Sequence, residues 1–300
     1  MKNYFYKIYN TILASEIEYP QLLKTQEAAP EIWIKVIKEI DGDSEEDYAN
    51  HVYTVSKSRI HFSNHKGSFI VTDGTTISIR PKKGIPMTDL TPFVFGYCIA
   101  MVFWQRGQLA IHCSAVKWKE KALIICGGSG SGKSTLTTKI LEHGGKLMTD
   151  DVAVVDFAKD GKALVLPAFP QQKLCRDAVA RNEFNTEELL YIDEDKDKFA
   201  ISRVGEFCDE PTELGGIVAL NRYSGNAVVA EQLQGHATLQ AILDNLFMKP
   251  VFEASLAFPP EDMMKCIKIA QTVPVYKLLR PMTGDTTEDQ IQSIKKLMKL

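Results

Sequence analysis

A glycine-rich stretch that ends in Lys-Ser-Thr is the clearest chemical feature of the sequence. Residues 126–135 read CGGSGSGKST and fit the phosphate-binding pattern G-x-x-x-x-G-K-[ST]. The glycines let backbone N–H groups close around a phosphate, and the start of the following helix adds a partial positive charge. We therefore predict a nucleotide-binding loop made of Gly127, Gly128, Ser129, Gly130, Ser131, Gly132, Lys133, Ser134 and Thr135. Lys133 would reach the β- and γ-phosphates, and the Ser134 hydroxyl would bind Mg²⁺.

Two adjacent carboxylates, Asp150 and Asp151, lie within an apolar segment after this loop. Apolar residues around acidic ones are typical of the end of a parallel strand in an α/β sheet, where ligands bind. Adjacent residues of a strand point to opposite faces, so the two carboxylates need not do the same job. One can hold Mg²⁺ and the other can accept a proton from an attacking hydroxyl. An Asp-Asp turn that ends a strand is the alternative interpretation.

Three further side chains are candidates for the same site. His112 lies in a predicted strand over residues 109–116, and a short polar turn leads from it into the strand before the loop. Consecutive strands usually pair as neighbours, so His112 is expected beside the loop. Lys173 and Arg176 follow a short predicted strand over residues 164–170. They are either phosphate or substrate clamps or part of a solvated face.

The elements that would position these residues can be read from the apolar pattern. Residues 122–126 are typical of a buried strand, and residues 135–143 can form a helix that Gly144 and Gly145 would end. Before them, a buried helix is expected over residues 91–106. The first third contains predicted strands, with a hairpin at Asp73-Gly74. The fold class predicted is α/β, with a small β-rich domain over residues 1–90 and a phosphate-loop domain over residues 91–300.

Composition limits the kinds of partner. The 300 residues are 45% hydrophobic and 24% charged with a net charge of −3, which indicates a soluble globular protein without general attraction to nucleic acid or anionic membrane. Six scattered cysteines without a C-x-x-C pair argue against a zinc site or a disulfide framework and favour a reducing cytosol. No signal peptide is recognised, and the apolar window over residues 92–104 is too short to span a bilayer. A cytoplasmic location is therefore expected.

The combination of these motifs resembles the HPr kinase/phosphorylase family, and more closely its HPr-kinase-like serine kinases from peptide-modifying gene clusters, including lasso-peptide precursor kinases. The resemblance covers roughly residues 109–300. It is carried by the histidine strand IHCSAV, the loop GGSGSGKST, the segment LMTDD, the stretch LPAFPQQKL and the closing strand VPVYKL. The resemblance implies the phosphate-loop fold of the family's C-terminal kinase domain, a mixed sheet with flanking helices, with ATP and Mg²⁺ as cofactors. The resemblance does not decide whether the protein forms a homo-oligomer.

Residue roles follow from the same resemblance. Asp151 would be the general base toward a substrate hydroxyl, Asp150 would lie close to the metal, and His112 would lie near the transferred phosphate. Glu213, in the segment ELGGI, is the nearest equivalent of the family's metal-binding glutamate, although the arginine of that motif is missing. The C-terminal signature associated with HPr docking and dephosphorylation is not recognisable.

The leading hypothesis is therefore an ATP-dependent kinase that acts on a serine of a peptide or protein, such as a ribosomal precursor peptide. A small-molecule kinase or an enzyme like phosphoenolpyruvate carboxykinase is a second hypothesis, because that enzyme class shares this loop architecture. A nucleotide-binding regulatory module, with slow hydrolysis and no acceptor, is a third. The Asp150-Asp151 pair, together with His112, favours an enzyme that transfers a phosphoryl group over a regulatory module.

Overall fold

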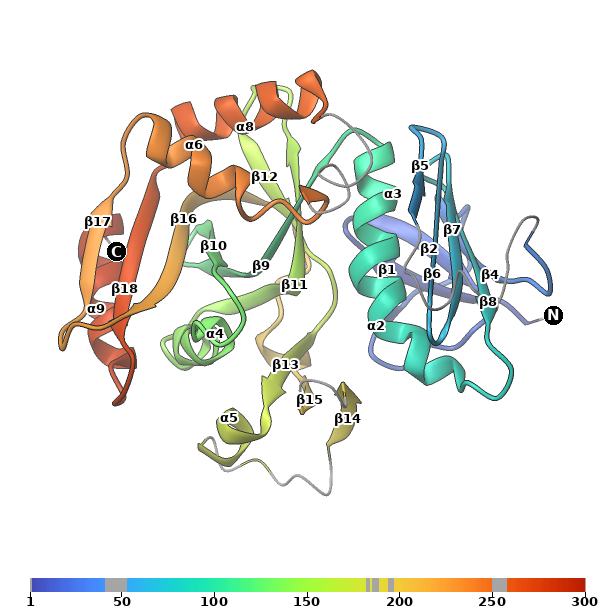
Figure 1. Ribbon diagram of the computed structural model, residues 1–300, viewed down its shortest axis with the longest axis horizontal. Helices are drawn as coiled ribbons and strands as arrows, with labels where there is room; N and C mark the ends of the chain where they lie inside the picture. The colour runs from blue at the N-terminus through green and yellow to red at the C-terminus, as the bar shows by residue number, and fades with distance from the viewer. Residues whose placement is uncertain are drawn as a thin grey trace. The chain divides into compact units, whose positions relative to one another are not determined.

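The computed structural model describes residues 2–40, 53–181, 184, 189–193, 197–249 and 258–299 (Figure 1). The chain divides into two compact units. The first contains Met1–Ala110 with Phe247–Pro259, and the second contains Ile111–Leu246 with Pro260–Leu300. The boundary predicted after residue 90 therefore lies later in the chain, because the helical stretch that follows it packs in the first unit.

The first unit is built on an eight-stranded sheet with the order β3-β1-β2-β4-β8-β7-β6-β5. The strands are β1 (Tyr4–Ile8), β2 (Thr11–Ser15), β3 (Leu23–Lys24), β4 (Ile32–Val36), β5 (Tyr53–Val55), β6 (Arg59–Asn64), β7 (Gly67–Thr72) and β8 (Thr76–Pro81). Asp73 and Gly74 join β7 to β8 with φ angles of 52° and 63°. Positive φ at both positions is what a tight hairpin turn requires, so the Asp-Gly signal predicts this hairpin correctly.

A helical stretch covers this sheet and consists of η1 (Met87–Leu90), α2 (Thr91–Phe93), a π-helical turn η2 (Val94–Cys98) and α3 (Ile99–Gln105). Its aromatic rings pack on the strands, with 5.7 Å between the centroids of Phe93 and Phe69. The 19 residues Met87–Gln105 have a mean hydropathy of 1.3, enough by length and composition alone to cross a membrane, and 61% of the apolar window is buried. The helical stretch is therefore longer than the apolar window expected over residues 92–104, which is too short to span a bilayer, and its burial is typical of a core helix.

The second unit contains a seven-stranded sheet with the order β10-β9-β11-β12-β16-β18-β17 and an additional β10–β16 pairing. Its strands are β9 (Leu109–Trp118), β10 (Lys121–Cys126), β11 (Lys146–Phe157), β12 (Ala163–Leu166), β16 (Thr212–Tyr223), β17 (Val229–Gln232) and β18 (Val275–Pro281). Strand β10 pairs antiparallel with β9 on one edge and parallel with β16 on the other. The extra pairing closes β9, β10, β16, β12 and β11 into a ring of hydrogen-bonded strands.

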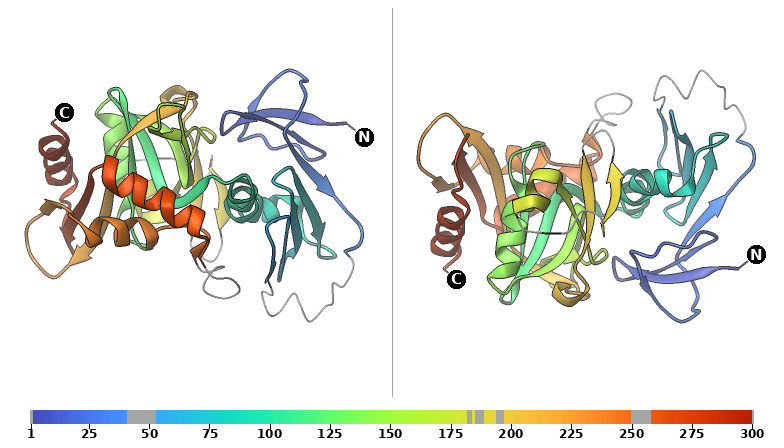
Figure 2. Two further views of the ribbon diagram at one scale, coloured as in Figure 1. Left: turned by 90° about the horizontal axis from the view of Figure 1, so that it is seen from above. Right: turned by 90° about the horizontal axis from the view of Figure 1, so that it is seen from below.

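A smaller sheet of β13 (Gln171–Cys175), β15 (Lys198–Ser202) and β14 (Leu190–Asp193) belongs to the same unit. The remaining elements are α4 (Lys133–Glu142), α5 (Arg176–Arg181), η4 (Val204–Glu206), α6 (His236–Leu243), α8 (Pro260–Thr272) and α9 (Thr287–Met298). Figures 1 and 2 show α6 beside α8, and α9 next to β17 and β18. All of these elements belong to the second unit, which also contains β10.

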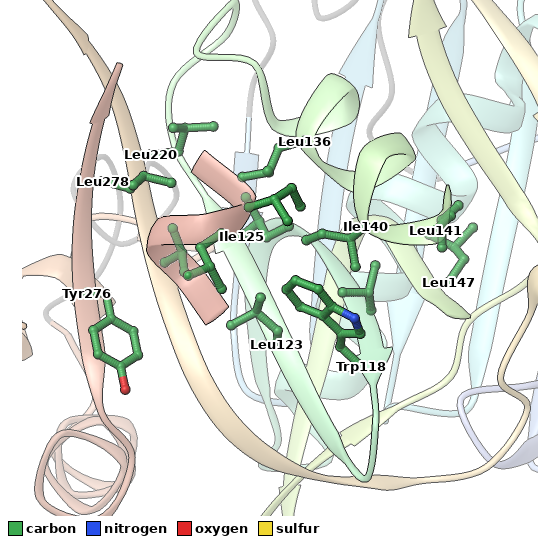
Figure 3. Close-up of a cluster of buried hydrophobic side chains, with 14 residues drawn as sticks. Trp118, Leu123, Ile125, Leu136, Ile140, Leu141, Leu147, Leu220, Tyr276 and Leu278 are labelled. Atoms are coloured by element: carbon green, nitrogen blue, oxygen red, sulfur yellow. The ribbon is translucent and has the colours of Figure 1, made fainter. Parts of the chain in front are cut away.

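Apolar packing fixes the helix that follows the glycine loop. Leu136 and Ile140 of α4 lie in one buried cluster with Leu123 and Ile125 of β10 (Figure 3). The cluster also includes Ile291 of α9, so α4 packs against both the sheet and a second helix. Burying an aliphatic side chain of this size contributes about 1.5–3 kcal/mol. This packing holds the strand, the loop and the helix in a fixed relation.

Candidate active site

The glycine loop connects β10 to α4, as the sequence predicts. Gly127, Gly130 and Gly132 have φ angles of 147°, 74° and 109°, a region that favours glycine. A Cβ atom at Gly127 would lie 2.7 Å from Ser131 Oγ and would overlap the carbonyl oxygen of Leu220 on β16. The loop therefore needs glycine at this position to bend closely over the neighbouring strand.

Lys133 folds back over the loop. Its Nζ donates to the carbonyl oxygen of Gly127 at 2.6 Å and lies 3.3 Å from that of Gly128. Burial lowers the pKa of Lys133, and the nearby charge of Asp150 partly offsets this effect. The ammonium group is thus held over the backbone that the sequence predicts to bind phosphate, within the electrostatic reach of Asp150.

Asp150 and Asp151 lie inside β11 and not at its end, which differs from the expectation. The strand continues from Lys146 to Phe157, but Asp151 has a φ of 101°, unusual for a residue with a side chain. The Thr149 hydroxyl donates to the Val152 carbonyl at 2.6 Å across this irregularity. Backbone strain of this kind is concentrated at functional sites. Both carboxylates contact Lys173, one through its backbone N–H and one through its Nζ, although regular alternation would direct them to opposite faces.

Asp150 accepts two hydrogen bonds. Its Oδ1 accepts from the Ser114 hydroxyl of β9, and its Oδ2 accepts from the backbone N–H of Lys173 at 2.7 Å. Burial nevertheless raises the pKa of Asp150, and the adjacent charge of Asp151 acts in the same direction. Ser114 follows His112 by two positions, so both lie on one face of β9. That spacing is a sequence signal that could have identified Ser114.

Asp151 contacts two basic side chains. Its Oδ2 lies 2.8 Å from Lys173 Nζ, and its Oδ1 lies 3.5 Å from His112 Nδ1. Burial favours a higher pKa for Asp151, but the charges of Lys173 and His112 outweigh it and lower the pKa to about 2. Burial also lowers the pKa of His112. Asp151 is therefore ionised at neutral pH, and its side chain remains 27% exposed.

Strand β13 links the loop helix to the acidic pair. The amide of Gln172, fully buried, donates to the Ser134 carbonyl in the first turn of α4 at 3.0 Å. Arg203 in turn donates to Gln172 Oε1 at 2.8 Å. The next residue, Lys173, contacts both aspartates. Of the two interpretations of Lys173, the structure therefore favours a role at the site, whereas Arg176 forms an exposed ion pair with Asp197 at 2.9 Å.

Glu213 lies elsewhere. It pairs with Leu164 of β12 and precedes Leu214, which pairs with Ala122 at the start of β10. The loop instead follows Cys126 at the end of β10, which pairs with Ala219. Its carboxylate pairs with Lys121 at 2.5 Å and Lys162 at 3.6 Å. The register thus separates Glu213 from the loop by most of the length of β10, and we leave it out of any metal site. Within the described ranges, no group of three or more His, Cys, Asp or Glu side chains could hold a metal ion.

Comparisons with known proteins add little to this geometry. Neither a protein-family model nor a curated protein sequence matches the chain. Among solved structures, the chain is similar to the Hpr(Ser) kinase/phosphatase from Coxiella burnetii, with 11% sequence identity over 63% of this chain and 92% of that chain. The TM-score is 0.31, and similarity at this level does not decide what the chain binds or does.

Proposed function

We propose that this chain transfers the γ-phosphate of ATP to a serine hydroxyl of a peptide or protein. The observation that carries the proposal is the arrangement of Lys133 and Asp151 around one site. Lys133 Nζ donates to the carbonyl oxygen of Gly127, the residue that follows Cys126 at the end of β10. Cys126 pairs with Cys113 of β9, and the preceding residue, His112, lies 3.5 Å from Asp151. A phosphate-binding cation and an ionised carboxylate in one place are the parts that in-line phosphoryl transfer needs.

The loop and Lys133 would bind and neutralise the phosphates. The backbone N–H groups of residues 127–134 would donate to phosphate oxygens, and the buried Ser131 hydroxyl, which has no hydrogen-bond partner within the described ranges, would be available to do the same. The positions of Lys133 and of the first turn of α4 are both fixed by hydrogen bonds. This preorganisation lowers the cost of orienting the γ-phosphate.

Mg²⁺ fits the donor groups present. Hydroxyl and carboxylate oxygens suit this hard cation, which is usually bound by one or two carboxylates together with substrate phosphates and water. Ser134 and Asp150 would hold it, with Ser114 and the Lys173 backbone orienting the carboxylate. When bound, the ion would neutralise charge that develops on the β- and γ-phosphates. A closed cage of protein ligands is not needed for this role.

Asp151 would orient the acceptor hydroxyl and take its proton. The serine oxygen forms a bond to the γ-phosphorus, the bond to the bridging oxygen breaks, and ADP leaves. A pKa of about 2 makes Asp151 a weak base in the ground state, so its contribution would come mainly from placement. Lys173 would keep it ionised and oriented, and His112 would lie beside the transferred phosphate.

The peptide or protein acceptor is supported by the sequence resemblance, because the motifs of residues 109–300 are similar to those of kinases that modify serine. The test is to incubate the protein with Mg-ATP and candidate peptides, including any small precursor peptide encoded beside it. Mass spectrometry should detect a gain of about 80 Da, one phosphoryl group, on a serine. The gain should be absent with Asp151→Asn. Tight ATP binding without transfer to any peptide would instead favour a small-molecule kinase or a regulatory module.

A further inference from the structure

A small cavity lies beside the glycine loop in the second unit. It is formed by Gly132 and Thr135 at the start of α4, by Arg280 at the end of β18, by the turn over residues 284–287 and by Gln290 of α9. The cavity encloses about 50 Å³, which admits a few polar atoms. None of the motifs that point to chemistry includes Arg280, Gln290 or this turn; Thr287-x-x-Gln290 matches only the capping pattern that opens a helix.

Gln290 provides an independent sign of a ligand. Its side chain is 3% exposed, and its Nε2 donates to Thr286 Oγ1 at 3.2 Å. Its Oε1 is buried and has no hydrogen-bond partner within the described ranges. Whichever way the amide is turned, one of its polar atoms remains unpaired. A buried polar atom without a partner costs free energy, so a ligand atom that bonds to Gln290 would recover it.

Arg280 connects this cavity to the glycine loop. Its Nε donates to the Ser131 carbonyl at 2.6 Å, and its Nη2 lies 3.4 Å from the Gly130 carbonyl. Its cross-strand neighbour on β16 is Arg222, whose Nη2 would lie 3.6 Å from a Cβ atom at Gly130. Two guanidinium groups therefore flank the outer side of the loop, where they would attract an anionic ligand that extends from the loop toward the cavity.

The strand order separates the two sides of the loop. His112 and Ser114 come from β9, on one edge of β10, and the acidic pair contacts them. Strands β16 and β18, with Arg222 and Arg280, lie on the other edge. A nucleotide whose phosphates occupy the loop therefore has its reacting end on the β9 side and its other end on the β18 side.

We propose that the cavity at Gln290 binds the nucleoside end of the nucleotide, with the Gln290 amide bonded to a polar group of the base or ribose. The proposal rests on the function given above, because it takes the loop as the phosphate site. The size of the cavity implies that one edge of the nucleoside enters while the rest lies along Arg280 and the 284–287 turn. ATP would then bind more tightly than its triphosphate portion alone.

The test compares ATP with inorganic tripolyphosphate by isothermal titration calorimetry. Gln290→Met preserves size but removes both polar atoms, and Gln292→Met makes the same change on the exposed face of α9. We expect Gln290→Met to weaken ATP binding about tenfold and leave tripolyphosphate binding unchanged, while Gln292→Met alters neither. Equal weakening of the binding of both ligands, or no change in ATP binding, would overturn the proposal.

A further titration with 2′-deoxy-ATP identifies the bonded group. If Gln290→Met no longer weakens the binding of this ligand, the bonded group is the ribose 2′-hydroxyl. If the variant still weakens it, the bonded group is on the base or is the other hydroxyl.

A second measurement uses the unaltered protein and so does not depend on the folding of a variant. Photolabelling with an azido-substituted ATP should modify a peptide containing residues 280–290, and excess ATP should prevent it. Labelling confined to other peptides would overturn the nucleoside site. Failure of the unaltered protein to bind either ATP or tripolyphosphate would refute the proposed function itself. Binding of both with equal affinity would refute only the nucleoside site.

Discussion

Lys173 holds both carboxylates of the acidic pair. Its Nζ lies 2.8 Å from Oδ2 of Asp151, and its backbone N–H donates to Oδ2 of Asp150 at 2.7 Å. The same residue therefore sets the ionisation of one carboxylate and the orientation of the other. Because Gln172 next to it contacts the first turn of α4, strand β13 couples the acidic pair to the glycine loop.

Lys173→Met should make activity sensitive to mild acid. Without this charge, the effect of burial on Asp151 is no longer outweighed, so its pKa should rise from about 2. In the unaltered protein Asp151 should not limit phosphoryl transfer above about pH 4, whereas in the variant the transfer rate should fall as pH decreases through the raised pKa. Lys173→Arg, which keeps the charge, is the control. Identical acid limbs for Lys173→Met and the unaltered protein would refute this role of Lys173.

The same pKa shift predicts how acid affects stability. Since folding lowers the pKa of Asp151 to about 2, its ionised form stabilises the fold at pH values above about 4, by about 2 kcal/mol. This contribution is lost as pH falls from about 4 toward 2. Urea denaturation of the unaltered protein and of Asp151→Asn should therefore give free energies of unfolding that converge over this interval. A difference that does not depend on pH would contradict the depressed pKa.

Lys133→Ala and Asp151→Asn should separate binding from transfer. Lys133→Ala removes the cation over the loop and should weaken ATP binding at least tenfold, about 1.4 kcal/mol, as well as abolish transfer. Asp151→Asn keeps the size of the side chain and should retain ATP binding while abolishing transfer. Calorimetry and mass spectrometry of the peptide product measure the two effects. Near-normal transfer by Asp151→Asn would mean that another group acts as the base.

Gly127→Ala should damage the loop, whereas Gly128→Ala should not. A Cβ atom at Gly127 meets the Leu220 backbone and Ser131 Oγ, at a φ of 147°. A Cβ atom at Gly128 has no neighbour within 4 Å. We expect Gly127→Ala to weaken ATP binding more than tenfold and Gly128→Ala to change it less than threefold. Equal affinities of the two variants, measured by calorimetry, would show that the tight bend is not needed for binding.

Ile140→Ala tests how packing of α4 supports the loop. Ile140 is fully buried in the cluster of Figure 3, so its truncation should lower the free energy of unfolding by about 2–5 kcal/mol. Lys139→Ala, on the exposed side of the same helix, should change it by less than about 0.5 kcal/mol. Urea denaturation followed by circular dichroism measures both. Similar losses in the two variants would contradict the assigned core.

The sequence by itself determines the parts that depend on neighbouring residues. The spacing of glycines predicts the loop between β10 and α4, and Asp73-Gly74 predicts a hairpin, because both depend on φ values that few residues other than glycine adopt readily. The position of His112 on the strand next to β10 also follows from a short connection. Each of these features depends on residues that are close together in the chain.

Tertiary structure alone decides which distant residues meet the loop. The register of β10 and β16 places Glu213 at the far end from the loop, although its motif resembled a metal ligand. Conversely, β13 brings Lys173 to Asp151 across 22 positions, and β18 brings Arg280 to Ser131 across 149 positions. Two adjacent carboxylates contact one lysine, at a place where Asp151 has an unusual φ of 101°. Strand pairing and side-chain packing set these contacts, and neither is encoded in the spacing of a local motif.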